Sequence, residues 1–164
     1  MILCITGSTI TPYERLLKKI DSIASHFAVP FVLQTGPYRL LSKSYESFTY
    51  VPYATLVGYY QRALLIISHL SAGPLIYARK FEKPIILVPR KKALGEAVAD
   101  NQIETAEALK AVHEPMRMIL DDIDELESAV TAMLGRARQN LRYCSGTTEI
   151  ESLHRVIRET CGLQ

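Results

Sequence analysis

The sequence contains no tryptophan and only three cysteines, Cys4, Cys144 and Cys161, which form neither a CxxC motif nor a metal-binding spacing. No apolar run is long enough to cross a membrane, and the first residues lack the features of a signal peptide. The net charge is only +2, and no basic tract is interleaved with aromatic residues. These absences argue against a disulfide framework, a membrane span and a nucleic-acid partner. They favour a protein of the reducing cytoplasm.

The chain has the length and composition of one soluble domain, with 164 residues of which 48% are hydrophobic and 22% charged. Short apolar runs alternate with amphipathic segments of helical length, which predicts a doubly wound α/β fold with a mostly parallel sheet. The predicted strands are residues 2–6, 31–34, 48–51, 64–67, 85–88 and 116–120. The predicted helices are residues 12–27, 53–62, a segment starting at Gly73, 100–112 and 123–141.

The segment 68–74, which follows a buried strand, has the chemistry of an anion site. Gly73 and Pro74 suit the start of a helix, whose free N–H groups and positive dipole end favour a phosphate. His69, Ser71 and Ala72 lie in the same turn. An ordinary helix start without a ligand, and a structural rather than catalytic His69, explain these residues equally well.

Two further strand ends should meet this turn at the same edge of the sheet, where open α/β sheets bind ligands. Gly7, Ser8 and Thr9 follow the first strand and predict a second phosphate or sugar loop. Arg90 follows the strand 85–88. Asp100 or Asn101 is expected to cap the next helix, with Gln102 in its first turn facing the strand ends.

Residues 1–135 form the predicted Rossmann-like α/β unit, and residues 136–164 form a helical tail. The tail has an apolar stripe of Ile150, Leu153, Val156 and Ile157. Such a stripe either packs on its own domain or docks a partner.

Several motifs in a fixed order carry a family resemblance: ITGST, QTG, ISH followed by AG, KPIILVPR, GE and DNQ. This order resembles the carboxyl-terminal half of the family 28 glycosyltransferases over roughly residues 1–130. The chain is most similar to the small donor-binding subunits of the eukaryotic UDP-N-acetylglucosamine transferase and of bacterial exopolysaccharide glycosyltransferases (E-type).

The resemblance implies one half of a GT-B glycosyltransferase, which binds a UDP-linked sugar and uses neither a metal nor a cofactor. A separate, membrane-associated subunit would bind the acceptor and supply most of the catalytic base, so His69 is the catalytic candidate in this chain. The donor-binding residues implied are Gly7, Ser8, Thr9, His69, Ser71, Ala72, Gly73, Tyr77, Arg90, Glu96, Asn101 and Gln102.

Four positions depart from the family pattern, whose turn reads His-x-Gly-x-Gly-Thr with a Glu three residues later. Ser71 and Pro74 stand in place of Gly and Thr, and Tyr77 stands in place of the Glu that contacts the ribose. A further family histidine is Ala97 here. Each lost hydrogen bond to the donor would cost about 1–3 kcal/mol.

The leading hypothesis is the donor-binding subunit of a two-component, inverting hexosyltransferase that makes a surface polysaccharide or a lipid-linked glycan. The second is a non-catalytic scaffold that keeps the fold with a degenerate donor site. The third is a small α/β nucleotide-binding or nucleotide-processing domain outside the family. For the first two, we expect a cytoplasmic protein that is peripheral to the membrane through its partner and is able to self-associate when alone.

Overall fold

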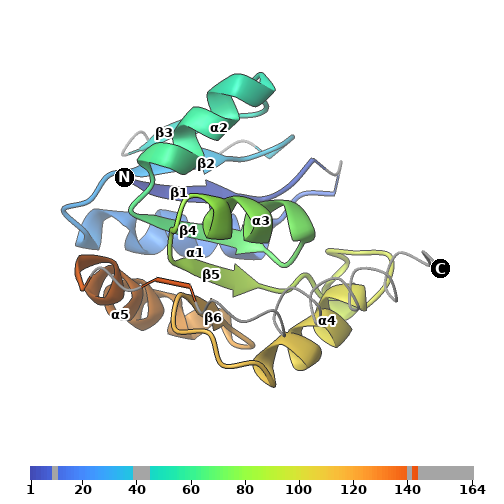
Figure 1. Ribbon diagram of the computed structural model, residues 1–164. Helices are drawn as coiled ribbons and strands as arrows, with labels where there is room; N and C mark the ends of the chain where they lie inside the picture. The colour runs from blue at the N-terminus through green and yellow to red at the C-terminus, as the bar shows by residue number, and fades with distance from the viewer. Residues whose placement is uncertain (9–10, 39–44, 140–141, 144–164) are drawn as a thin grey trace.

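A computed structural model describes residues 1–8, 11–38, 45–139 and 142–143, which form an α/β unit around a six-stranded sheet (Figure 1). The strands are β1 (Ile2–Ile5), β2 (Phe31–Gln34), β3 (Glu46–Phe48), β4 (Leu65–His69), β5 (Ile85–Val88) and β6 (Arg117–Ile119). The helices are α1 (Glu14–Ile23), α2 (Tyr53–Arg62), α3 (Ala72–Lys80), α4 (Asn101–Lys110) and α5 (Leu126–Arg138). Short 3₁₀ turns occupy Ala24–His26, Lys92–Leu94 and Ile123–Glu125.

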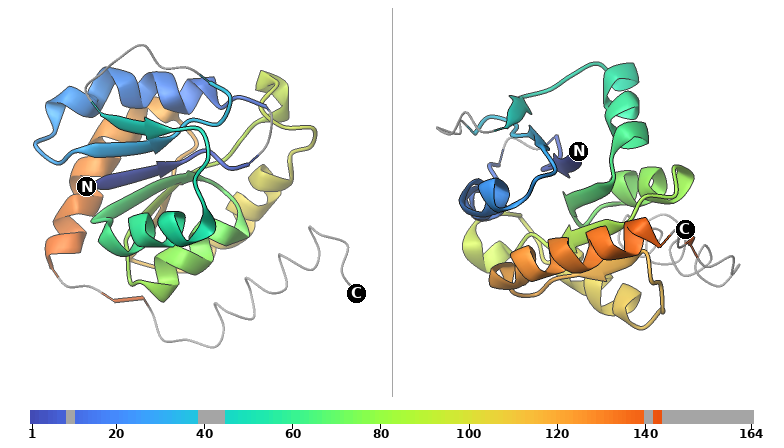
Figure 2. Two further views of the ribbon diagram at one scale, coloured as in Figure 1. Left: turned by 90° about the horizontal axis from the view of Figure 1, so that it is seen from above. Right: turned by 90° about the vertical axis from the view of Figure 1, so that its left-hand side faces the viewer.

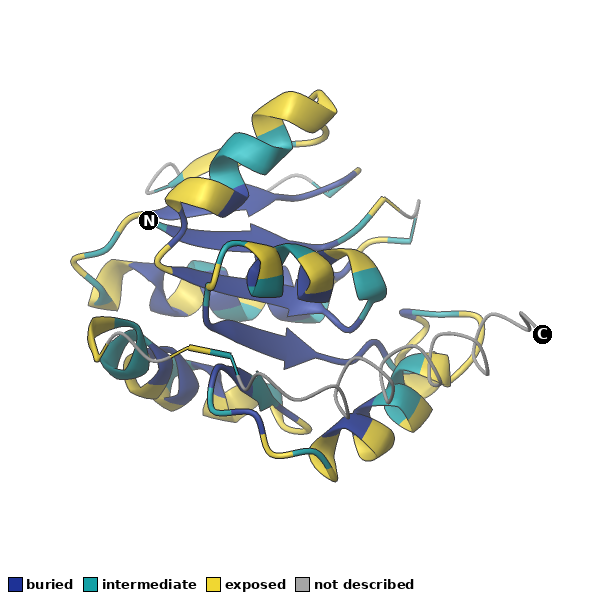
Figure 3. Ribbon diagram, viewed as in Figure 1, coloured by how far each residue is buried: buried dark blue, intermediate teal, exposed yellow. Residues whose placement is uncertain are grey.

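The four inner strands β1, β2, β4 and β5 are buried throughout their length, as Figure 3 shows. Their runs are apolar up to the carboxyl ends of β2 and β4, where Gln34, Ser68 and His69 lie, because helices cover both faces of a parallel sheet. Alternate residues point to opposite faces, so Ile2 and Cys4 pack on one side and Leu3 and Ile5 on the other. The sheet therefore divides the interior into two apolar layers.

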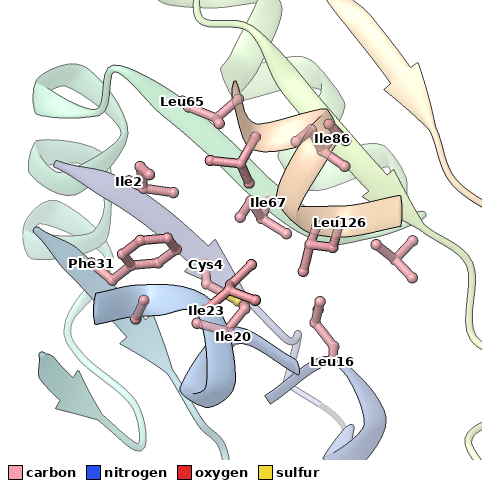
Figure 4. Packing of buried hydrophobic residues seen from close by; sticks show 14 of the residues in the cluster. Ile2, Cys4, Leu16, Ile20, Ile23, Phe31, Leu65, Ile67, Ile86 and Leu126 are labelled. Carbon is pink, nitrogen blue, oxygen red and sulfur yellow. The ribbon is translucent and has the colours of Figure 1, made fainter. Parts of the chain in front are cut away.

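Helices α1 and α5 cover one face of the sheet, and α2, α3 and α4 cover the other (Figure 2). Figure 4 shows the first layer, where Leu16, Ile20 and Ile23 of α1 and Leu126 of α5 pack against the strands. The helical spacing of the α1 residues explains this packing, since residues three or four apart share a face.

All strand pairs are parallel, and their order is β3-β2-β1-β4-β5-β6. The order reverses between β1 and β4, because the chain first builds outward through β2 and β3 and then returns to the other side. Ligands of open α/β sheets bind at such a reversal, beyond the carboxyl ends of the strands. We call this side the carboxyl edge and the opposite side the amino edge.

The fold confirms the predicted α/β class with a wholly parallel sheet, and it corrects several element bounds. The first helix begins at Glu14 rather than residue 12, and β4 starts at Leu65. The edge strand β3 covers Glu46–Phe48 rather than residues 48–51, because its exposed polar residues lack an apolar signature. Helix α5 starts at Leu126, and α5 runs continuously across the expected boundary at residue 135. The expected tail helix and its apolar stripe lie outside the described residues.

No helix within the described ranges is long and apolar enough to span a membrane.

Candidate functional site

The ends of β1 and β4 meet where the strand order reverses, and there Gly7 lies against His69. Gly7 has a φ of +92°, and a Cβ built on it would lie 2.8 Å from Cε1 of the His69 ring. A residue with a side chain would be strained by this φ and would also clash with the imidazole. Glycine is therefore required here by its neighbour and by its backbone.

The His69 side chain is nine-tenths buried, and its Nδ1 lies 3.3 Å from Ser68 Oγ and 3.5 Å from the Ile5 carbonyl oxygen. Burial, together with the nearby positive charge of Arg90, lowers the pKa of His69 to about 4. The ring is therefore neutral at pH 7 and a weak base. In this position the His69 ring packs against Gly7. A catalytic role for His69 stays a prediction.

Gln102 ties the ends of β4 and β5 together from the first turn of α4. Its Oε1 accepts hydrogen bonds from the backbone N–H of Leu70 at 3.2 Å and of Arg90 at 3.0 Å. The side chain thus faces the strand ends, as predicted, and its carbonyl oxygen is already used within the fold. Asp100 does not cap α4 with its carboxylate, which instead accepts from the Lys92 N–H at 3.0 Å.

Arg90 follows β5 and is buried, with 3% of its surface exposed. Its guanidinium donates to three carbonyl oxygens, those of Thr6 at 2.8 Å, Thr11 at 3.0 Å and Glu96 at 2.9 Å. It lies over the Tyr13 ring, with Cζ 4.5 Å from the centroid. Nε has no hydrogen-bond partner among the described residues, and burial lowers the pKa of Arg90. Arg90 therefore joins the loop after β1 to the loop after β5.

The carboxylate of Glu96 pairs with Arg15 rather than with Arg90. Arg15 donates from Nε at 2.9 Å and from Nη2 at 3.0 Å, so both carboxylate oxygens of Glu96 are engaged. The Lys91 N–H adds a third hydrogen bond to Glu96 at 3.0 Å. Tyr13 completes the cluster by donating from its hydroxyl to the Val88 carbonyl oxygen at 2.8 Å. Glu96 is predicted to bind the sugar donor, and in this structure its carboxylate is bonded to Arg15.

Helix α3 begins at Ala72, with Ser71 as its N-cap and no side-chain capping hydrogen bond. The backbone N–H groups of Ala72 and Gly73 have no partner among the described residues. Pro74 occupies the third helical position rather than the predicted first, and it removes one N–H from this turn. Gly73 has an ordinary helical backbone, and a Cβ on it would meet nothing within 4 Å. The turn thus offers two free donors beside open space.

Tyr77 faces helix α2 as part of an aromatic cluster. Its ring stacks on Tyr60, with centroids 4.8 Å apart, and on Phe81, with centroids 6.1 Å apart. Its hydroxyl is hydrogen-bonded to the hydroxyl of Tyr53, and this bond raises the pKa of Tyr77. Contact between Tyr77 and a sugar donor stays a prediction. The ring is already held between α2 and α3.

The remaining predicted residues are more exposed. Ser8 and Asn101 are exposed, and Thr9 lies outside the described residues. A hollow of about 500 Å³ opens beside the pair Arg15 and Glu96. It is lined further by Thr11, Pro12, Glu14, Lys18, Leu94 and Gly95.

The sequence reasoning missed Tyr13 and Arg15, which hold the carboxyl edge together. No local signal could have found the partner of Arg15, since Glu96 is 81 residues away. It also missed Tyr50, which is 50% exposed in the segment between β3 and α2, and Tyr53, which is 69% exposed at the first position of α2. Exposed aromatic residues following a strand at this edge were a usable signal, because stacking platforms for planar ligands need such rings.

Comparison with known proteins gives the chain a family, since the model for the glycosyltransferase family 28 C-terminal domain matches residues 1–157. The chain belongs to this family. The match covers nearly the whole sequence and includes every described element. It confirms the resemblance drawn from the ordered motifs and makes this a glycosyltransferase domain. No curated protein matches the sequence.

Solved glycosyltransferase structures share the fold at low sequence identity. The kitacinnamycin glycosyltransferase aligns with a TM-score of 0.62 and 17% identity, over 98% of this chain and 39% of its own. The calicheamicin glycosyltransferase aligns with a TM-score of 0.59 and 15% identity, over 84% of this chain and 37% of its own. A spinosyn forosaminyltransferase aligns with a TM-score of 0.55 and 18% identity, over 84% of this chain and 37% of its own. This chain thus spans less than half the length of these structures and has the fold of one GT-B half.

Within the described ranges, no three His, Cys, Asp or Glu side chains are grouped so that they could hold a metal ion. The expectation that the family chemistry needs no metal here stays a prediction.

Proposed function

We propose that this domain binds a nucleotide sugar at the carboxyl edge and acts as the donor half of a glycosyltransferase. The observation that carries the proposal is the arrangement at the reversal of strand order. There, the N–H groups of Ala72 and Gly73, which have no partner among the described residues, open helix α3 after β4. Gln102 joins the end of β4 to the buried Arg90 after β5. A diphosphate is the part of a nucleotide sugar that such donors and charge favour.

The charge balance of the cluster supports an anionic ligand. Arg15 and Arg90 contribute two positive charges, and Glu96 contributes the one carboxylate that pairs with either of them among the described residues. His69 stays neutral. Within the part of the chain that the structure describes, the Arg90 guanidinium donates only to carbonyl oxygens, and the Glu96 carboxylate that acts on it is already paired with Arg15. The cluster of Arg15, Arg90 and Glu96 therefore carries a net positive charge, which would stabilise a nearby phosphate.

The wider role rests on the family resemblance. The chain aligns with less than half the length of each of the solved glycosyltransferase structures. We propose that a separate subunit, associated with the membrane, binds the acceptor and supplies the catalytic base, and that a UDP-sugar is the donor. The product would be a surface polysaccharide or a lipid-linked glycan. In this proposal, Arg90 and His69 contact backbone carbonyl oxygens and so position the loops that bind the sugar donor. Neither side chain acts on the acceptor.

Calorimetric titration with UDP, UDP-N-acetylglucosamine, UDP-glucose and UDP-glucuronate tests donor binding, using Gly73→Asp and Gly73→Ala as a matched pair. A Cβ added at Gly73 meets no atom within 4 Å, so both variants should fold. Saturable binding that Gly73→Asp abolishes and Gly73→Ala retains is the expected result. No binding by the chain or by its complex with the acceptor subunit would contradict the proposal.

A scaffold is the second candidate function, favoured by how many predicted donor ligands are already used inside the fold. Glu96, Gln102 and Tyr77 all have internal partners, and Pro74 removes a donor from α3. Pro74→Thr restores that N–H without disturbing the aromatic cluster, whereas Tyr77→Glu would break it. Donor binding gained through Pro74→Thr would count against a scaffold, and a chain that supports transfer by its partner without binding donor would favour one.

A further inference from the structure

A second cationic surface lies at the amino edge, at the opposite end of the strands from the candidate donor site. It combines Arg79 and Lys80 of the last turn of α3, Lys83 before β5, and Arg142. Among the described residues, the carboxylate of Glu82 lies within this set, 4.0 Å from Arg142. We call this set, together with the apolar residues described next, the amino-edge patch.

Apolar and aromatic side chains are interleaved with these cations. Leu64 is 49% exposed and lines a hollow of about 400 Å³ together with Lys83 and Arg142. Arg79 lies over the Tyr143 ring at 5.7 Å, and Lys80 lies over the Phe81 ring at 5.6 Å. The Tyr143 hydroxyl donates to the Lys83 carbonyl oxygen at 2.8 Å, which fixes the ring on the patch.

Helix capping accounts for only part of this surface. Cations in the last turn of a helix complement its dipole, which explains Arg79 and Lys80. Lys83 and Arg142 lie outside the described helices, and Arg142 is 80% exposed. The exposed Leu64 lines one hollow with Lys83 and Arg142, and this combination of an apolar side chain with cations suits an interface that is both anionic and apolar.

We propose that the amino-edge patch docks directly on an anionic membrane surface. The basic side chains would meet lipid phosphates, while Leu64 and the aromatic rings would reach the boundary of the acyl chains. Basic clusters of this size bind anionic bilayers through summed, salt-sensitive attraction. This contact belongs to the domain itself and needs neither the donor nor an acceptor subunit.

Co-sedimentation of the full chain with phosphatidylcholine vesicles, with and without phosphatidylglycerol, tests the proposal. Binding is expected only with the anionic lipid and should weaken as salt rises. The double variant Lys80→Glu with Arg142→Glu should weaken it about tenfold or more, since each basic residue near the surface contributes separately. Both side chains are exposed, so the fold should be unaffected.

Lys18→Glu with Lys92→Glu is the matched control, because it makes the same change of net charge on exposed side chains away from the amino edge. It should retain most of the binding, and Leu64→Asn should reduce it. Equal binding to neutral vesicles, equal loss in both double variants, or no vesicle binding would overturn the proposal. Competition by millimolar glycerol phosphate would overturn it too, since it would indicate a site for a small phosphate ester rather than a bilayer.

Discussion

The His69 imidazole occupies the space beside Gly7, so that a Cβ on Gly7 would lie 2.8 Å from its Cε1 atom. This contact joins the ends of the two strands between which the sheet reverses its order. The turn after β1, at the candidate donor site, is therefore tightly packed against the His69 ring. The predictions below follow from this contact and from the network around it.

Replacing Gly7 by alanine should lower the free energy of unfolding by about 2 kcal/mol or more, because the new residue is strained at a φ of +92° and clashes with His69. Gly73→Ala is the comparison, since its added methyl group points into open space in a helix. That variant should be neutral or stabilised by up to about 1 kcal/mol. Urea unfolding of both variants measures the difference, and similar values for the two would contradict it.

Stability should rise with pH between about 4 and 6.5 because of His69, whose pKa falls from 6.5 in the unfolded chain to about 4 in the fold. The unfolded chain binds the extra proton in this window, so the contribution is complete above pH 6.5 and lost as the pH falls through 4. It amounts to about 3 kcal/mol at most.

The His69→Gln variant isolates this contribution. Its unfolding free energy should depend less on pH than that of the parent across the same window. An unchanged slope between the two proteins, measured by urea unfolding at several pH values, would show that His69 is not buried as a neutral ring.

Arg15 and Glu96 should be coupled by about 1–3 kcal/mol, because the pair is bidentate and largely buried. A double-mutant cycle with Arg15→Met and Glu96→Gln measures this coupling. The exposed pair Lys18 and Glu14, one turn apart on α1, serves as a control and should give a much smaller coupling. Equal coupling in the two cycles would mean that the first pair adds nothing by its burial.

Arg90→Lys should lower the free energy of unfolding by about 3 kcal/mol, although the charge is kept. The planar guanidinium reaches the carbonyl oxygens of Thr6, Thr11 and Glu96 at once, and a single ammonium group cannot reproduce that fork. Thermal unfolding followed by circular dichroism measures the loss. Lys91→Arg, at the neighbouring half-buried position, should change little by comparison.

The buried strands were predictable because their apolar runs carry their own signature, as β2 and β5 show at the predicted bounds. The edge strand β3 was displaced because Glu46 and Ser47 are exposed and give no such signature. The turn after β4 was recognised, but its helix begins one residue before Gly73. Sequence spacing identified some of the residues at the carboxyl edge, such as Gly7, His69 and Gln102, but it missed Tyr13 and Arg15.

What spacing could not give was which of these residues are already used by the fold. Arg90 and Glu96 both fit ligand positions by their spacing, yet Arg90 is bonded to three carbonyl oxygens and Glu96 to Arg15, which lies 81 residues earlier in the chain. Tyr77 fits a ligand position by its place after Gly73, and its ring instead packs on Tyr60. Such choices depend on contacts between segments far apart in the chain, which no local pattern records.

The central claim is that a nucleotide diphosphate binds the free N–H groups at the start of α3. NMR spectroscopy of the ¹⁵N-labelled chain during titration with UDP tests it most directly, by following the amide signals of Ala72 and Gly73. The account predicts that both amide protons shift downfield in a saturable manner, and that Gly73→Asp removes the effect. Unmoved signals at α3, with saturable shifts confined to other parts of the domain, would contradict it.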